Sequence, residues 1–312
     1  MRIRLPFALP RALGLLALSQ GCRCSTAVTE VDHQSFIRCA MLDPPAARAV
    51  RIGAQELKVN GRRAEVSGPL PARVAVFTGP VGASLTHVDI AEVAALNPTQ
   101  VWVLGGIGDD LATTSSTLAA LAELSVPVLL VPGGADRPAL VDAALAGLPS
   151  PAAQRIVHGA GLAGLEVGRQ HFLLVPGAPN GRYAIDAEAC GFVAEDIDVL
   201  IEGAKAHDRR PWVISWGAPG GLGIAETREA GDLGSPEIAR LMTSVRARGG
   251  IFAWPEVASA ASRGPSNHEL LAWVPRLGRT GTLTADGGRL GSGLLLLRIT
   301  DAGVERITVT TP

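Results

Sequence analysis

Three apolar runs alternate with helix-like segments between residues 73 and 148, and this alternation limits the possible folds more than any other feature. The runs are almost continuously apolar, which is typical of parallel strands buried on both faces. Each is followed, after a short loop, by apolar residues at helical spacing. The pattern predicts parallel strand–helix–strand units. It places strands at 73–78, 100–105 and 126–134, and helices at 85–96, 111–124 and 138–148.

The second half of the chain has shorter strand signals that are separated by glycine turns. Short antiparallel strands are predicted at 154–160, 164–170 and 171–177. Longer apolar runs return at 196–203, 209–221 and 250–257. The domain is predicted to end with antiparallel strands at 269–278, 292–300 and 303–310. Between them, residues 235–250 predict a helix that Ser235 caps and Pro236 begins.

Residues 50–68 contain an Asn60-Gly61 turn between two alternating stretches, which predicts a β-hairpin. Upstream of it the chain has little periodicity. We therefore divide the chain into a signal segment at 1–21, a tether at 22–49, a hairpin leading into the domain at 50–72, and one domain at 73–312.

The amino terminus has the character of an export signal. Basic residues 1–4 precede an apolar stretch at 5–18, which is too short to span a bilayer. Small residues directly before Cys22 resemble a bacterial lipoprotein signal, in which Cys22 would carry lipid. In one departure from that pattern, Leu18 stands four positions before the cysteine rather than three. We expect an exported protein of the cell envelope, lipid-anchored to the outer membrane or otherwise periplasmic, with ordinary secretion as the alternative.

Export permits disulfide bonds, and three cysteines remain beyond Cys22. Cys24 and Cys39 form the local candidate pair. The alternative is that Cys190 is unpaired and buried and that the other two are reduced.

Charge and motifs exclude several classes of protein. The formal net charge is −1 and no basic stripe is visible, so nucleic acid is not an expected partner. The chain has no phosphate-binding P-loop (G-x-x-x-x-G-K-[ST]) and no complete dinucleotide-binding fingerprint (G-x-G-x-x-G). It also has no nucleophile elbow (G-x-S-x-G) of the α/β-hydrolase type.

Five loops at the predicted strand ends carry a family resemblance. They are FTGPVG (77–82), GGIGD (105–109), GGAD (133–136), SWGAPGG (215–221) and AWPE (253–256). Their order is similar to that of D-x-H, G-D-x-x-D, G-N-H-D, a histidine before Ala-Pro, and G-H-x-H in the calcineurin-like metallophosphoesterases. The resemblance runs from Arg73 to the carboxyl terminus. It implies an α/β fold, a four-layered αββα sandwich with two mixed sheets.

The resemblance also implies where metal ligands would stand, and almost all of them are replaced. The family's aspartate and histidine of the first loop match Gly79 and Val81, and its bridging aspartate matches Gly106. The remaining ligand positions match Gly134 and Ala135 in the third loop, Gly217 or, one register off, Trp216 in the fourth, and Trp254 and Glu256 in the last.

This replacement bears directly on catalysis. A two-metal phosphoesterase needs carboxylate and imidazole donors at fixed positions, and glycine, alanine and valine side chains donate nothing. We expect no metal cofactor and no catalytic residue, and a protein that binds or scaffolds an envelope protein or a small ligand. The alternative is a remodelled phosphoric ester hydrolase that holds one divalent metal ion with Asp109, Asp136 and Glu256. A third hypothesis is an unrelated nucleotide-binding α/β module.

The remaining polar and aromatic residues of these loops have two interpretations each. The three carboxylates form a remnant polar pocket, or they cap helices and accept backbone N–H bonds. Trp216 and Trp254 either line the pocket in which the family holds its metal ions, and there contact a planar ligand, or they fill that pocket and stabilise the packing. The rim could add Asn180, Arg182 and Tyr183, with Arg182 as an anion contact or a solvated arginine.

The six histidines do not cluster by spacing, so each is interpreted as an ordinary surface or core histidine: His33, His87, His158, His171, His207 and His268.

Overall fold

The computed structural model describes residues 36–80, 83–180, 183–222, 225–227, 231–254, 270–273 and 294–307. The predicted signal segment, Cys22 and Cys24 lie outside these residues. Of the helices in the described ranges, none is both long enough and apolar enough to cross a membrane.

The first sheet contains the predicted strand–helix–strand units. Its order is β19-β18-β5-β6-β7-β8, and β5 to β8 run parallel. The strands are β5 (Ala72–Phe77), β6 (Gln100–Leu104), β7 (Val128–Val131), β8 (Ile156–His158), β18 (Leu295–Ile299) and β19 (Val304–Ile307). The connecting helices are α1 (His87–Ala95), α2 (Leu111–Leu121), α3 (Pro138–Ala146) and α4 (Ser150–Arg155). The alternation around residues 73–148 was therefore interpreted correctly, and the antiparallel pairing of β18 with β5 and β19 makes the sheet mixed.

The second sheet has eight strands in the order β17-β16-β13-β10-β9-β4-β3-β2. They are β2 (Arg48–Ile52), β3 (Gln55–Asn60), β4 (Arg63–Ser67), β9 (Gly164–Val167), β10 (Gln170–Val175), β13 (Trp212–Gly217), β16 (Gly249–Trp254) and β17 (Leu270–Trp273). Helices α5 (Ala194–Lys205) and α6 (Pro236–Ser244) pack against one face of it. Two short sheets complete the described strands, one with β1 (Ile37–Arg38), β12 (Cys190–Phe192) and β11 (Ala178–Pro179), the other with β14 (Glu226–Thr227) and β15 (Gly231–Asp232).

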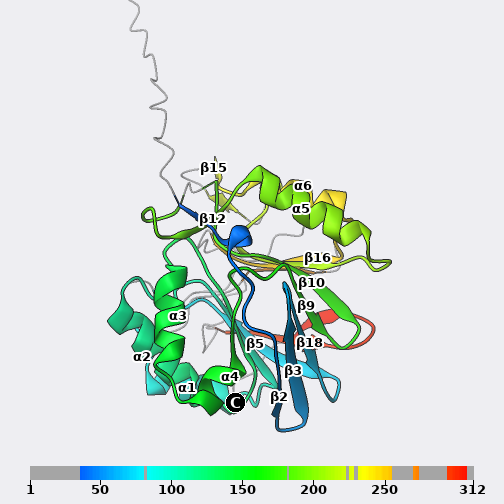
Figure 1. Cartoon of the computed structure of the whole chain (residues 1–312). Helices are drawn as coiled ribbons and strands as arrows, with labels where there is room; N and C mark the ends of the chain where they lie inside the picture. Colours follow the sequence, from blue (N-terminus) through cyan, green and yellow to red (C-terminus); the bar gives the residue numbers. More distant parts are fainter. Residues whose placement is uncertain are drawn as a thin grey trace, which may run out of the picture. The chain divides into compact units, whose positions relative to one another are not determined.

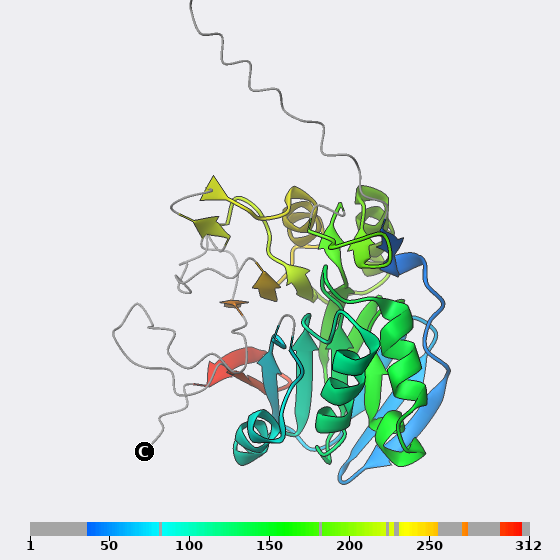
Figure 2. The ribbon, with the colours of Figure 1, turned by 90° about the vertical axis from the view of Figure 1, so that its left-hand side faces the viewer.

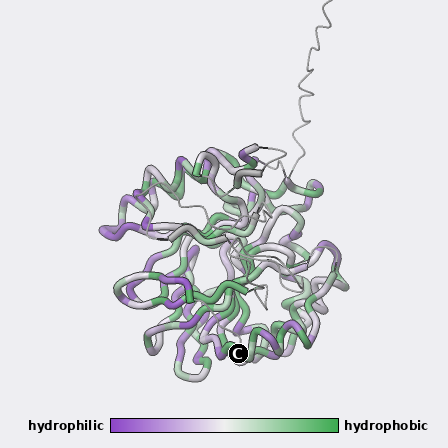
Figure 3. Tube along the Cα trace, turned by 180° about the vertical axis from the view of Figure 1, so that it is seen from behind, coloured by the Kyte–Doolittle hydropathy of each residue, from purple (hydrophilic) through white to green (hydrophobic). Residues whose placement is uncertain are grey.

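The two large sheets face each other across a shared core, with helices on their outer sides (Figures 1 and 2). Trp102 of β6 and Phe172 of β10 meet edge to face there, with ring centroids 5.2 Å apart. Neighbouring residues of the same strands point outward to the helices, because side chains alternate along a strand. Figure 3 shows hydrophobic residues gathered on the inner strands and hydrophilic ones on outer loops. This is an α/β sandwich with two facing mixed sheets.

The Asn60-Gly61 hairpin is present, and it belongs to the second sheet. Strands β3 and β4 pair antiparallel, with Asn60 opposite Arg63. Gly61 takes the first position of the two-residue loop with φ +54°, a conformation that suits glycine in a type II′ turn. Strand β4 then pairs parallel to β9, so that the hairpin extends the sheet.

Three predictions of local structure were wrong. Residues 196–203, an apolar run, lie in helix α5, where the apolar residues face β10 and β13 at helical spacing. The strand predicted within 154–160 pairs parallel to β7, not antiparallel, because α3 and α4 together connect the two strands. Strand β17 also pairs parallel, with β16, rather than joining an antiparallel finish.

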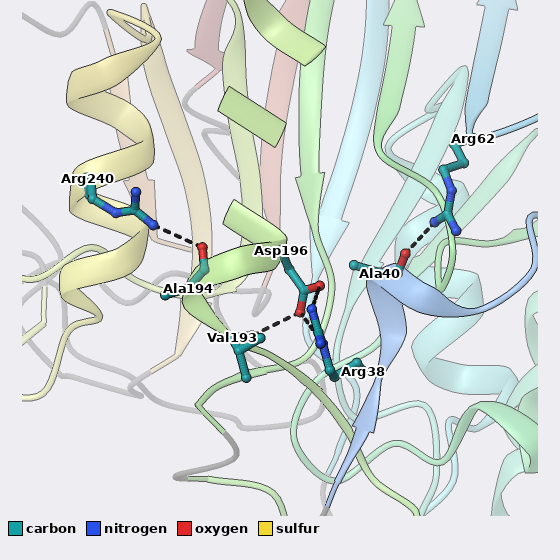
Figure 4. Close-up of polar contacts among 7 residues, drawn as sticks. All are labelled: Arg38, Ala40, Arg62, Val193, Ala194, Asp196 and Arg240. Carbon is teal, nitrogen blue, oxygen red and sulfur yellow. Dashed lines mark hydrogen bonds and ion pairs between the residues drawn. The ribbon is translucent and has the colours of Figure 1, made fainter. Parts of the chain in front are cut away.

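Residues 36–46, the amino-terminal strap, were expected to be part of a tether but are fastened to the domain (Figure 4). β1 pairs with β12, and Cys39 forms a disulfide with Cys190, which corrects the local Cys24–Cys39 pairing. Arg62 donates to the carbonyl oxygens of Ala40 (2.5 Å) and Leu42 (3.0 Å).

An ion pair adds to this attachment. Arg38 donates to both carboxylate oxygens of Asp196, at 3.2 and 2.7 Å, and Asp196 also accepts from the Val193 backbone amide at 3.0 Å (Figure 4). Asp196 is only 3% exposed, so that it depends on these donors for its hydrogen bonds.

We expect Asp196→Ala to lower the free energy of unfolding by about 1–3 kcal/mol, because it leaves a buried amide and the Arg38 guanidinium without their acceptor. Asp198 lies on the same helix and pairs with Arg240, but its side chain is 58% exposed. Asp198→Ala should therefore cost no more than about 1 kcal/mol. Urea denaturation of both variants tests the difference, and equal losses would contradict it.

Candidate functional site

The loops after β5, β6 and β7 meet at the carboxyl edge of the first sheet. The Gly79 amide donates to the Gly105 carbonyl oxygen at 3.0 Å, and the Gly105 amide donates to Val131 at 2.8 Å. A Cβ atom placed on Gly79 would lie 1.9 Å from the Gly106 carbonyl oxygen, and one on Gly106 would lie 2.2 Å from that of Gly79. The first two loops therefore pack backbone against backbone, with no room for a side chain between them.

Trp216, at the end of β13 in the second sheet, packs on these glycine turns. Cβ atoms placed on Gly105 and Gly133 would lie 2.4 and 2.6 Å from its Cδ1 atom. The residue is 9% exposed and belongs to the core shared by the two sheets. Of the two interpretations of Trp216, the geometry favours the second, since the indole fills the space beside two loops.

Gly134 and Gly217 lie in the same region, and both face strand β11. A Cβ on Gly134 would lie 2.9 Å from that of Ala178, and one on Gly217 would lie 3.4 Å from the Pro179 Cδ atom. Gly217 also pairs with Trp254 of β16. The predicted loops of both sheets thus converge on one neighbourhood.

Asp136 lies fully buried beneath the loops of the first sheet. One carboxylate oxygen accepts from the amides of Ile107 (2.7 Å) and Gly108 (3.2 Å), and the other accepts from Gly133 (2.7 Å). Burial raises its pKa to about 6, although the three amides and the nearby His158 oppose this shift. These bonds agree with the interpretation of Asp136 as a backbone acceptor that holds two glycine loops together.

Asp109 has a different environment. It is half-buried, and its charge contributes to the raised pKa of Arg137, whose main partner is Asp186. The Asp186 carboxylate accepts from Arg137 Nε at 2.9 Å. The next residue, Asp110, caps α2 by accepting from Thr113 at 2.9 Å. Asp109 and Asp136 share no hydrogen-bonding partner among the described residues.

The rim contains a hydrogen-bonded group of three residues, of which the sequence suggested only Asn180 as a site residue. Asn180, with φ +49°, donates its side-chain amide to Glu237 at 2.6 Å, and Ser235 donates its hydroxyl to the same carboxylate at 2.7 Å. Burial raises the pKa of Glu237, but these hydrogen bonds outweigh it and hold the pKa below its usual value. The Ser235 cap and Pro236 at the start of α6 were predicted correctly, and Glu237 follows directly.

The other predicted residues are only partly covered by the structure. Tyr183 is half-buried, packs against the central core, and has its carbonyl oxygen 2.3 Å from a Cβ placed on Gly134. Ala135 follows Gly134 in the third loop and is half-buried. Val81, Arg182, Glu256 and the side chain of Trp254 lie outside the described residues.

The donors near these loops do not fit a pair of catalytic metal ions. Among the described residues, no three histidine, cysteine or acidic side chains are grouped so that they could hold a metal ion. The oxygens of Asp136 are already engaged by backbone amides, and a donor side chain at Gly79 or Gly106 would collide with the opposing backbone. The described histidines have other partners: His87 faces Glu123, His158 binds Asp142, and the His171 ring contacts that of His207.

Comparisons with known proteins show the fold alone. No protein-family model matches the chain, and no curated protein matches it either. One solved crystal structure aligns with 77% of this chain and 100% of its own, with a TM-score of 0.53 and 14% sequence identity. The crystal structure of TT1561 from Thermus thermophilus aligns with 59% of this chain and 81% of its own, with a TM-score of 0.41 and 14% identity. The first superposition shows that the α/β arrangement occurs in another protein.

Proposed function

We propose that this chain has a calcineurin-like metallophosphoesterase fold that has lost its metal centre, and that it binds or scaffolds a partner instead of hydrolysing phosphate esters. The partner would be an envelope protein or a small ligand. The helix–sheet–sheet–helix layering and the convergence of the glycine loops support the fold assignment, because the family resemblance predicted both from the loop order.

One observation carries the loss of catalysis: the contact between the backbones of Gly79 and Gly106. In the family pattern these two positions hold metal ligands. Here the loops approach so closely that neither position accepts even a methyl group without moving backbone. Trp216 occupies the space beside the same loops. A missing donor could be replaced by a neighbouring side chain after a small movement. The close contact between the two loop backbones could not be relieved in this way.

The alternative is a hydrolase with one metal ion held by Asp109, Asp136 and Glu256. The hydrogen bonds of Asp136 count against it, because a metal would have to compete with three backbone amides for its two oxygens. We further propose, from the amino-terminal sequence, that the protein is exported and lipid-anchored through Cys22.

Purified disulfide-bonded protein should contain no more manganese, iron or zinc than its buffer, as measured by elemental analysis. It should also leave p-nitrophenyl phosphate and bis-p-nitrophenyl phosphate intact when each divalent cation is added. Two metal ions per chain would refute the proposal. One metal ion with hydrolysis that Asp109→Ala and Asp136→Ala both abolish would instead establish the hydrolase.

A further inference from the structure

A cavity of about 640 Å³ lies between the amino-terminal strap and helices α3 and α4, away from the glycine loops. Its volume is within the range of sites that bind small organic molecules. Twelve of its 18 lining residues are apolar, and they include Ile37 and Leu42 of the strap, Leu145 of α3 and Ile156 of β8. An occupant of this cavity would therefore bury mostly hydrocarbon.

Arg48 supplies a positive charge to the wall of this cavity. Its Nη2 atom donates to the Ile156 carbonyl oxygen at 2.7 Å, whereas its Nε atom is buried and has no acceptor. No described carboxylate forms an ion pair with it. Burial lowers the pKa of Arg48, which reflects a half-buried cation without a counter-ion. Such a charge is better stabilised when an anion pairs with it.

The other polar groups of the wall restrict the kind of anion. His158 has a side chain only 7% exposed, and its Nδ1 atom lies 2.8 Å from the carboxylate of Asp142. The Asp142 and Asp43 carboxylates both line the cavity. They would repel a dianion such as phosphate more strongly than a singly charged group, because Coulomb repulsion scales with charge.

We propose that this cavity binds a monocarboxylate with an apolar body, whose carboxylate pairs with the Arg48 guanidinium and whose hydrocarbon packs against the strap and α3. A guanidinium and a carboxylate match in a two-point, charge-assisted geometry. The proposal does not depend on the function proposed for the glycine loops.

Isothermal titration of the purified, disulfide-bonded chain with octanoate tests this site, with octanamide and octyl phosphate as matched ligands. Octanoate should bind at least about tenfold more tightly than octanamide, since an ion pair worth 1.4 kcal/mol gives that ratio. It should also bind more tightly than octyl phosphate, whose larger charge Asp43 and Asp142 repel more strongly. Equal binding of octanoate and octanamide, tighter binding of octyl phosphate, or no binding of octanoate would overturn the proposal.

Three variants separate the ion pair from a general effect of charge. Arg48→Met should abolish the preference for octanoate over octanamide but leave octanamide binding unchanged. Arg51→Met is the control, because Arg51 lies exposed on the same strand and outside the cavity. It should bind octanoate like the unmodified protein. Arg48→Lys keeps the positive charge but loses the paired N–H donors of the guanidinium, and it should retain part of the preference for octanoate over octanamide. A preference that survives in Arg48→Met, or is lost equally in Arg51→Met, would contradict the assignment, and thermal melts verify that each variant is folded.

Discussion

Gly79→Asp is expected to destabilise the protein severely instead of restoring a metal ligand. The first atom of the new side chain would lie 1.9 Å from the Gly106 carbonyl oxygen, so that backbone would have to move. Overpacking of a closed interior typically costs about 1–3 kcal/mol and can cost more. Backbone on both sides leaves no flexible side chain to yield, and we expect a loss of about 3 kcal/mol or more. Urea denaturation followed by circular dichroism measures it.

Gly203→Asp is the matched control. Gly203 lies exposed on α5, and a Cβ placed there meets nothing within 4 Å. The same chemical change should alter the free energy of unfolding by no more than about 0.5 kcal/mol. If Gly79→Asp is as stable as Gly203→Asp and also binds manganese, the loops open easily and steric closure does not explain the loss of the centre.

Asp136→Asn is expected to remove a pH dependence from the stability of the protein. The pKa of Asp136 is about 6 in the folded state, compared with an ordinary value of 3.8. Between these values the folded state binds more protons than the unfolded state, so stability falls as pH rises. Two pKa units correspond to about 3 kcal/mol, most of it lost by about pH 6 and the remainder by about pH 7. The asparagine cannot titrate and should not show this decline.

Urea denaturation at intervals from pH 4 to pH 7 tests the expectation, with Asp198→Asn as the exposed control. The difference between Asp136→Asn and the unmodified protein isolates the buried group, because the other titrating groups are common to both. The asparagine should also be less stable near pH 7 by about 1–3 kcal/mol, since its NH2 group faces a backbone donor. Parallel pH curves would contradict the raised pKa.

Local patterns in the sequence predicted much of the fold. The apolar runs of β5, β6 and β7 and the capped start of α6 depend on residues close together in the chain, and these elements formed as expected. The segment 196–203 was misjudged because a short apolar run suits a buried helix as well as a strand. Strand β8 pairs parallel to β7 because helices α3 and α4 connect the two strands, whereas the glycine turns around β8 suggested an antiparallel strand.

Contacts between distant segments could not be inferred in the same way. Cys39 and Cys190 are 151 residues apart, and spacing favoured the nearer cysteine as partner. For the site, loop order predicted that the glycines meet. It did not predict that Trp216 packs against Gly105 and Gly133, because that contact joins the two sheets. The Asn180–Glu237 bond likewise joins segments 57 residues apart.

The Cys39–Cys190 bond also determines how the domain would respond to mechanical force. Tension arriving from the amino-terminal side reaches Cys39 and passes through a covalent bond into β12, next to helix α5. While the bond is intact, such a pull cannot peel the hairpin strands β2, β3 and β4 from the sheet one after another, because Cys39 precedes them in the chain. The two-residue pairing of β1 and the Arg38 ion pair precede Cys39 and would bear such a load first. After reduction, the load would pass beyond Cys39 to the hydrogen bonds that Arg62 donates to Ala40 and Leu42, which are reversible.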